Sequence, residues 1–122
     1  MNYWSNILAV LGAFFVYALI KRATQIPLQK ALDYLRNGAL LIDVRSTAEF
    51  NSGHLPGAFN LPLNLIHNPL PRRVKDKNQV LLLYCHSGMR SGVARRKLKS
   101  MGYANTFNLG SYRRAERIAN SK

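Results

Sequence analysis

The chain has 122 residues, with 18 lysines and arginines against 5 aspartates and glutamates, and a formal net charge of +13. This length allows one small domain with a single hydrophobic core and excludes two catalytic domains. The single cysteine excludes an internal disulfide. Because this cysteine and the three histidines lack metal-ligand spacing, no metal site and no cofactor are predicted.

The N-terminal segment, residues 1–22, is predicted to be a transmembrane anchor. Its apolar run over 3–20 has no charged residue and measures roughly 27 Å as a helix, close to the ~30 Å hydrocarbon core of a bilayer. Residues 4–20 are therefore expected to contact the membrane. Lys21 and Arg22 follow the run and no basic residue precedes it, which predicts a single-pass protein with a cytoplasmic domain. The alternative is a signal peptide, cleaved after export, although a basic n-region is missing.

Helices and strands are predicted to alternate after this segment. Gly38 is a natural stop for the first helix, and the continuous apolar run that follows it is typical of a strand buried on both faces. Ser46 and Glu49 have the spacing of a capping box, which opens a short helix. In chain order, these elements are a helix over 27–37, a strand over 39–44, a short helix from 46 and a short strand over 58–60.

The second half of the chain continues the same alternation. Its predicted elements are a short helix or loop over 63–70, a solvated connection over 72–79, a strand over 80–84, a helix over 91–101, a strand over 105–109 and a terminal helix over 112–119. In the helix over 91–101, Val93, Ala94, Leu98 and Met101 are expected to face inward. The pattern predicts an α/β domain over 23–122, with a parallel sheet, helices on both faces, and ligands at the carboxyl ends of the strands.

Cys85 is the predicted nucleophile. It directly follows the apolar run over 80–84 and precedes a helical pattern, so it is expected where free N–H groups and the helix dipole stabilise an anion. A buried core cysteine is the alternative, but such a residue needs no turn of serine and glycine after it. Four residues separate Cys85 from Arg90, one fewer than in cysteine phosphatases, and a tighter loop suits a sulfur atom better than a phosphate.

Two separated motifs resemble the rhodanese family. The first comprises Leu41-Ile42-Asp43-Val44-Arg45, Glu49-Phe50 and Gly53-His54-Leu55-Pro56-Gly57-Ala58, and the second is Tyr84-Cys85-His86-Ser87-Gly88-Met89-Arg90-Ser91. The resemblance extends over about 26–109. It implies a single-domain sulfurtransferase with a rhodanese-like fold, in which the loop cysteine takes sulfur from a small anionic donor such as thiosulfate and passes it to a thiol or to cyanide.

The resemblance also implies roles for individual residues. Cys85 would carry the persulfide, and the substrate would be bound by His86, Ser87, Gly88, Met89, Arg90 and Ser91. One departure is His86, since the family often has arginine at this position. Asp43 and Arg45 leave the carboxyl end of a neighbouring strand, so we expect them to support the site or to hold loops together, not to catalyse.

Other functions compete with a thiosulfate sulfurtransferase, although a non-catalytic rhodanese-like binding module would normally lack the cysteine that is present here. A membrane-tethered persulfide carrier would need one specific partner for fast turnover, whereas a cysteine phosphatase or an arsenate reductase would use the same thiolate on an oxyanion. The basic clusters suit an anionic leaflet or anionic substrates. No nucleic-acid partner is expected, because no binding motif or run of stacking aromatics accompanies these clusters.

Overall fold

A four-stranded parallel sheet forms the centre of the computed structural model, which describes residues 2–122. The strand order is β2-β1-β3-β4. The strands are β1 (Leu40–Asp43), β2 (Phe59–Asn60), β3 (Leu81–Cys85) and β4 (Thr106–Ser111). All neighbouring strands are parallel, so their carboxyl ends meet at one edge of the sheet. The predicted α/β fold is confirmed.

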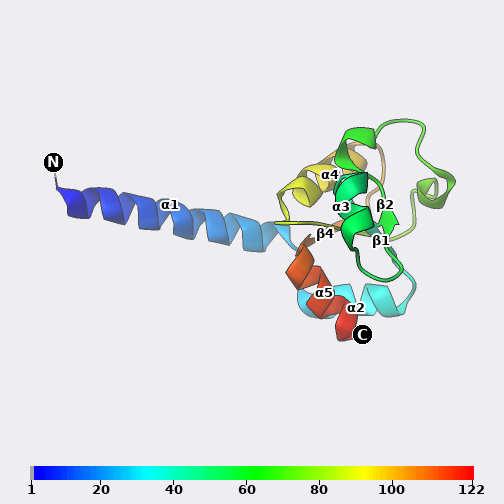
Figure 1. The fold of residues 1–122 in the computed structure, drawn as a ribbon, viewed down its shortest axis with the longest axis horizontal. Helices are drawn as coiled ribbons and strands as arrows, with labels where there is room; N and C mark the ends of the chain where they lie inside the picture. Colours follow the sequence, from blue (N-terminus) through cyan, green and yellow to red (C-terminus); the bar gives the residue numbers. More distant parts are fainter. Residues whose placement is uncertain (1) are drawn as a thin grey trace.

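Helices cover both faces of this sheet (Figure 1). The α-helices are α1 (Tyr3–Thr24), α2 (Leu28–Arg36), α3 (Thr47–Ser52), α4 (Met89–Ser100) and α5 (Tyr112–Asn120), and two short 3-10 helices are η1 (Leu63–Leu65) and η2 (Arg72–Val74). Helices α2 and α5 pack together on one face, and α4 packs against β3 and β4 on the other.

The alternation of side chains along β3 places the thiol beneath α4. Every residue of β3 is buried, since helices cover the sheet on both sides. Tyr84 points into the core formed with α2 and α5. Cys85 points into the opposite core, where it lies with Ala94 and Leu98 of α4. The residue that ends the strand therefore meets the first turn of the following helix.

Two local predictions were wrong. Val93 does not face inward but is 42% exposed, because the inward stripe of α4 consists of Ser91, Ala94 and Leu98. The connection over 72–79 is not solvated throughout, because η2 buries Val74 completely. Helix α4 also begins at Met89, two residues earlier than predicted, which shortens the loop after Cys85.

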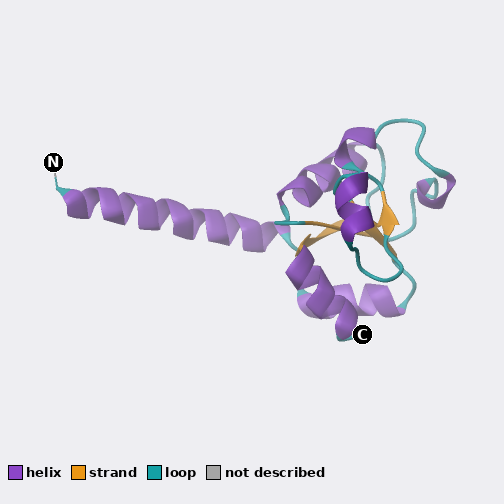
Figure 2. Cartoon of the chain, viewed as in Figure 1, coloured by secondary structure: helices purple, strands orange, loops and turns teal. Residues whose placement is uncertain are grey.

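Helix α1 projects from the domain (Figure 2). None of its described residues is buried, and it is long and apolar enough to cross a membrane by length and composition. Its C-terminal end is held on the edge strand, because Gln25 bridges to Asn108 and the Ile26 N–H donates to the Asn108 carbonyl at 2.9 Å. A short, hydrogen-bonded segment thus joins α1 to the sheet.

Candidate active site

The Cys85 sulfur accepts hydrogen bonds from two backbone N–H groups. Gly88 N lies 3.0 Å and Ser91 N 3.4 Å from Sγ. The Ser91 hydroxyl is 3.5 Å from Sγ, but it donates its single proton to Asn108 Oδ1 at 2.7 Å. The backbone at the start of α4 is therefore the main source of donors to the sulfur. Such an arrangement stabilises a thiolate or a bound sulfur anion.

A close approach between two glycines sets the shape of the loop after Cys85. Gly88 is the N-cap of α4 and has a φ of 92° and a ψ of −4°, a left-handed conformation that glycine adopts readily. A Cβ atom at this position would lie 3.1 Å from the backbone of Gly110 in β4. No larger residue fits between the loop and the end of β4 without displacing backbone.

Asn108 ties the loop to β4, although nothing in the sequence pattern singled it out. Its side chain is 2% exposed. Its Oδ1 accepts hydrogen bonds from the Ser91 hydroxyl and from Gly110 N at 2.9 Å, and its Nδ2 donates to the Gly88 carbonyl at 3.2 Å. Both residues that donate to the thiol, Gly88 and Ser91, are thus positioned by one buried amide.

Arg90 forms an ion pair with Glu49, the N3 residue of α3. Arg90 Nη1 lies 2.7 Å from Glu49 Oε1, and Nη2 lies 2.9 Å from Oε2. The guanidinium lowers the pKa of the Glu49 carboxyl from 4.5 to about 2, and the carboxylate raises the pKa of Arg90. Glu49 also completes the predicted capping box with Ser46, which is confirmed. The first turn of α4 is thereby fastened to α3.

Asp43 and Arg45 form a buried pair beside the site. Arg45 Nη2 lies 2.7 Å from Asp43 Oδ2 and also donates to the Gly53 carbonyl at 2.7 Å. The guanidinium stacks 4.9 Å from the ring centroid of Tyr112. Neither side chain makes a hydrogen bond to Cys85. Their contacts connect β1, the loop after α3 and the start of α5.

An open groove of about 560 Å³ lies above the loop, between α3 and the start of α5. It is lined by Arg45, Glu49, Ser52, Gly53, His86, Ser111, Tyr112 and Arg113, a set we call the loop groove. Arg45 is paired with Asp43 and Glu49 with Arg90, whereas Arg113 has no ion-pair partner among residues 2–122, so the loop groove favours anions through Arg113. His86 is the residue next to the thiol, and its carbonyl accepts a hydrogen bond from Tyr112 N.

The residues predicted to bind the substrate, 86–91, therefore lie in different surroundings. Gly88 and Ser91 contact the sulfur, His86 lines the loop groove, and Arg90 pairs with Glu49. Ser87 pairs with Ser111 of β4 in an isolated bridge. Met89 is exposed and faces away from the loop groove, into a cavity beside α1.

The chain is similar in sequence to known proteins. Thiosulfate sulfurtransferase PspE of Escherichia coli (strain K12) is 38% identical over 69 residues, which cover 57% of this chain and 66% of that protein, just under two thirds of its length. YqhL of Bacillus subtilis (strain 168), an uncharacterized protein, is 34% identical over 108 residues, covering 84% of each chain.

A solved structure described as a rhodanese with anions from E. coli is also similar. It superposes with a TM-score of 0.59 at 34% identity, covering 63% of this chain and 91% of that one. The family model for the rhodanese-like domain matches residues 27–114, which include the capping box of α3, the loop after β3 and the buried amide of β4. Because that match spans more than half of the sequence and contains the whole thiol site, the chain belongs to the rhodanese family of sulfurtransferases.

Proposed function

We propose that this protein is a membrane-anchored sulfurtransferase that carries sulfane sulfur as a persulfide on Cys85. The observation that supports it most is the pair of N–H donors, Gly88 and Ser91, directed at Sγ from the start of α4. These donors stabilise the attacking thiolate and would equally stabilise the terminal sulfur of a persulfide, which is also anionic.

The proposed reaction has two displacements. The Cys85 thiol first loses its proton to solvent, and the thiolate attacks the outer sulfur of thiosulfate. A new S–S bond forms, the old one breaks, and sulfite leaves with the electron pair. An acceptor thiolate then attacks the outer sulfur of the persulfide, and the Cys85 thiolate leaves with the electron pair; with cyanide as acceptor the product is thiocyanate.

Access to the sulfur requires movement of the loop. Cys85 is 0% exposed, so a donor larger than water cannot touch Sγ in this conformation. The loop groove borders the thiol at His86, and its cations would attract an anionic donor before the loop opens. The similar structure described as a rhodanese with anions from E. coli supports an anionic ligand in general terms.

The thiosulfate proposal can be tested by intact mass. The full chain in detergent is treated with thiosulfate, and its mass is measured before and after addition of cyanide. We expect a gain of one sulfur atom that cyanide removes, and no gain in Cys85→Ser. Because Cys85 is the only cysteine, the added sulfur can lie nowhere else. No gain by a folded protein with a free thiol contradicts thiosulfate as donor.

A persulfide carrier for a specific partner is the second candidate. The complete burial of Cys85 favours it, because a partner protein seated over the loop groove could open the loop where a small donor cannot. Slow loading by thiosulfate, together with fast loading by a persulfidated protein, would support the carrier. Hydrolysis of an aryl phosphate or reduction of arsenate would instead support the phosphatase or the reductase.

The membrane part of the proposal concerns α1. Its length, its apolar composition and the lack of any buried residue among those described in it favour a bilayer as its surroundings. Lys21 and Arg22 in its last turn favour a cytoplasmic domain. Retention of the full-length mass in carbonate-washed membranes is expected for an anchor. A mass reduced by the N-terminal segment would instead identify a signal peptide.

A further inference from the structure

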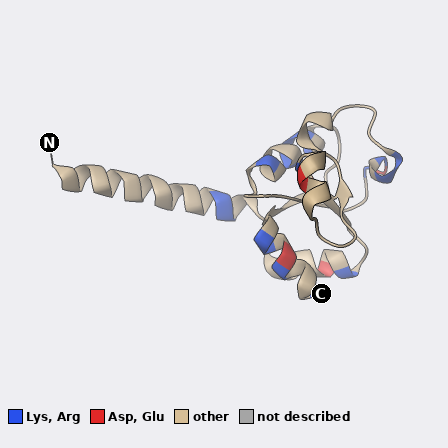
Figure 3. Ribbon diagram, viewed as in Figure 1, with Lys and Arg blue, Asp and Glu red and all other residues tan. Residues whose placement is uncertain are grey.

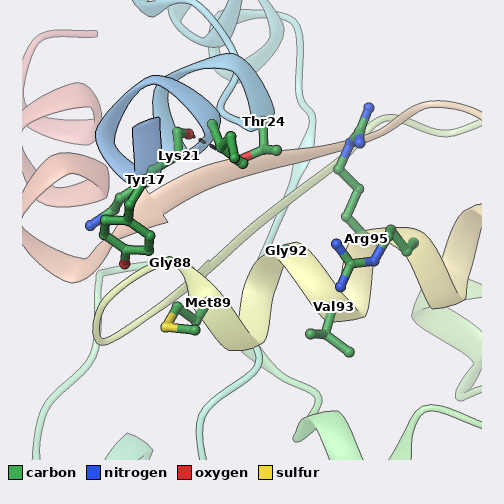
Figure 4. A pocket seen from close by; sticks show the side chains of 10 residues that line it. Tyr17, Lys21, Thr24, Gly88, Met89, Gly92, Val93 and Arg95 are labelled. Carbon is green, nitrogen blue, oxygen red and sulfur yellow. Dashed lines mark hydrogen bonds between the residues drawn. The ribbon is translucent and has the colours of Figure 1, made fainter. Parts of the chain in front are cut away.

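A second cavity, of about 270 Å³, lies between the end of α1 and the first half of α4, and we call it the anchor-side cavity (Figure 4). Helix α1 contributes Tyr17 and Ile20, and α4 contributes Met89 and Val93. All four side chains are between 42% and 62% exposed, Val93 the least and Met89 the most. The cavity thus has apolar walls that nothing in the described chain covers.

Basic side chains surround these apolar walls. Lys21, Arg95 and Arg96 line the anchor-side cavity, and no acidic residue does. None of the three has an ion-pair partner among residues 2–122. Arg95 Nε donates to the Thr106 carbonyl at 3.1 Å, which holds its guanidinium at the edge of the sheet. The blue segments in Figure 3 show that basic residues gather on α4 and at the end of α1.

The position of the anchor-side cavity along α1 indicates what fills it. The apolar run of α1 ends at Ile20, and Lys21 follows. If α1 spans a bilayer, the roughly 27 Å of helix before Lys21 place the cavity at the depth of the lipid headgroups. The hydrogen bond from Ile26 to β4 fixes the domain at this depth, since no flexible linker intervenes.

We propose that the anchor-side cavity binds one anionic phospholipid. Its phosphate would pair with Lys21, Arg95 and Arg96, and an acyl chain would lie against Tyr17 and Ile20. The charge and the apolar walls match the two parts of such a lipid. This site rests on the proposed membrane anchorage and is independent of sulfur transfer. Because Gly88 also lines the cavity, the lipid would lie directly behind the loop that follows Cys85.

Native mass spectrometry of the full chain tests this site. The protein is equilibrated in micelles that contain equal amounts of phosphatidylglycerol and phosphatidylcholine with the same acyl chains. The variant Lys21→Gln with Arg96→Gln removes two charges from the cavity. The matched control, Lys97→Gln with Lys99→Gln, removes two charges from exposed positions of α4 that do not line it.

We expect the wild type and the control to retain one phosphatidylglycerol in preference to phosphatidylcholine, and the cavity variant to lose about tenfold in this preference. Equal retention of both lipids by the wild type, or an equal loss in both variants, would overturn the site. Binding of inorganic phosphate by the wild type without retention of phosphatidylglycerol would show that a free anion, not a lipid, occupies the cavity.

Failure of the anchor is distinguishable from failure of the cavity. A chain that has lost α1 by intact mass has no cavity, which overturns the lipid site together with the membrane anchorage. A full-length chain that shows no lipid preference overturns the lipid site alone. Loading of Cys85 with sulfur is measured on the same samples and reports on sulfur transfer in either case.

Discussion

Arg90 and Glu49 meet in a bidentate ion pair that joins the first turn of α4 to α3, with N–O distances of 2.7 and 2.9 Å. The guanidinium expected to face the sulfur donor is therefore already paired with a carboxylate. Both side chains are 38% exposed, so solvent screens the pair only in part. An anionic donor that approaches through the loop groove meets the carboxylate together with the cations.

Replacement of Glu49 by glutamine should improve the use of thiosulfate. Glutamine keeps the hydrogen-bonding shape of the capping box but removes the negative charge that repels the donor. We expect KM for thiosulfate to fall about threefold or more, with little change in kcat, because the Arg90 charge is no longer neutralised. Glu116→Gln removes a charge from an exposed position of α5 and serves as the matched control. A rise in KM would instead show that Glu49 positions Arg90 for the donor.

The same ion pair should make the free energy of unfolding depend on pH below the ordinary pKa of a glutamate. The folded-state pKa of Glu49, about 2, lies below its ordinary 4.5. The contribution of the ion pair to the free energy of unfolding is therefore complete above pH about 4.5 and is lost as the pH falls toward 2. Because both side chains are partly exposed, we expect an effect below about 1 kcal/mol. Urea unfolding of wild type and Glu49→Gln, followed by circular dichroism, should show a difference that shrinks across this window; a constant difference contradicts it.

Loss of the buried amide at position 108 should destabilise the loop and expose the thiol. Asn108→Ala leaves the Gly110 N–H and the Ser91 hydroxyl without their acceptor. We expect the free energy of unfolding to fall by about 2–3 kcal/mol and Cys85 to react faster with iodoacetamide than in the wild type. Asn105→Ala is the control, since its exposed side chain makes one hydrogen bond, to the Asn78 carbonyl. An unchanged rate of alkylation in Asn108→Ala would show that the Asn108 amide does not hold the loop over the thiol.

The predictable features of this protein are those encoded locally. The alternation of buried runs and amphipathic helices, the capping box of α3, and a thiol at the start of a helix all depend on residues within a few positions of one another. Each was predicted, with element ends that shifted by one or two residues. Side-chain periodicity was less reliable in α4, where Val93 lies outside the inward stripe of Ser91, Ala94 and Leu98.

The features that were missed depend on strand register and on loop position. Asn108 pairs with Leu83 directly before an irregularity that shifts the pairing of β3 with β4, and its side-chain amide contacts Gly88 and Ser91. No local pattern encodes such a shift. The Glu49–Arg90 pair joins residues that are 41 positions apart. In the sequence, the capping box already accounted for a glutamate at position 49, so nothing there indicated this ion pair.

Replacement of Gly88 by alanine should impair sulfur loading far more than an equivalent change elsewhere. Gly88 and Gly57 both have positive φ, 92° and 78°, so alanine at either position costs about 1–2 kcal/mol of backbone strain. Only at Gly88 would the new Cβ lie 3.1 Å from backbone, that of Gly110, whereas nothing lies within 4 Å at Gly57. Relief of this contact must move the loop away from β4 and shift the Gly88 N–H from Sγ. We therefore expect Gly88→Ala to unfold more easily than Gly57→Ala and to load sulfur from thiosulfate at least about tenfold more slowly, as measured by intact mass over time. Equal loading rates in the two variants would show that the Gly88 N–H is dispensable.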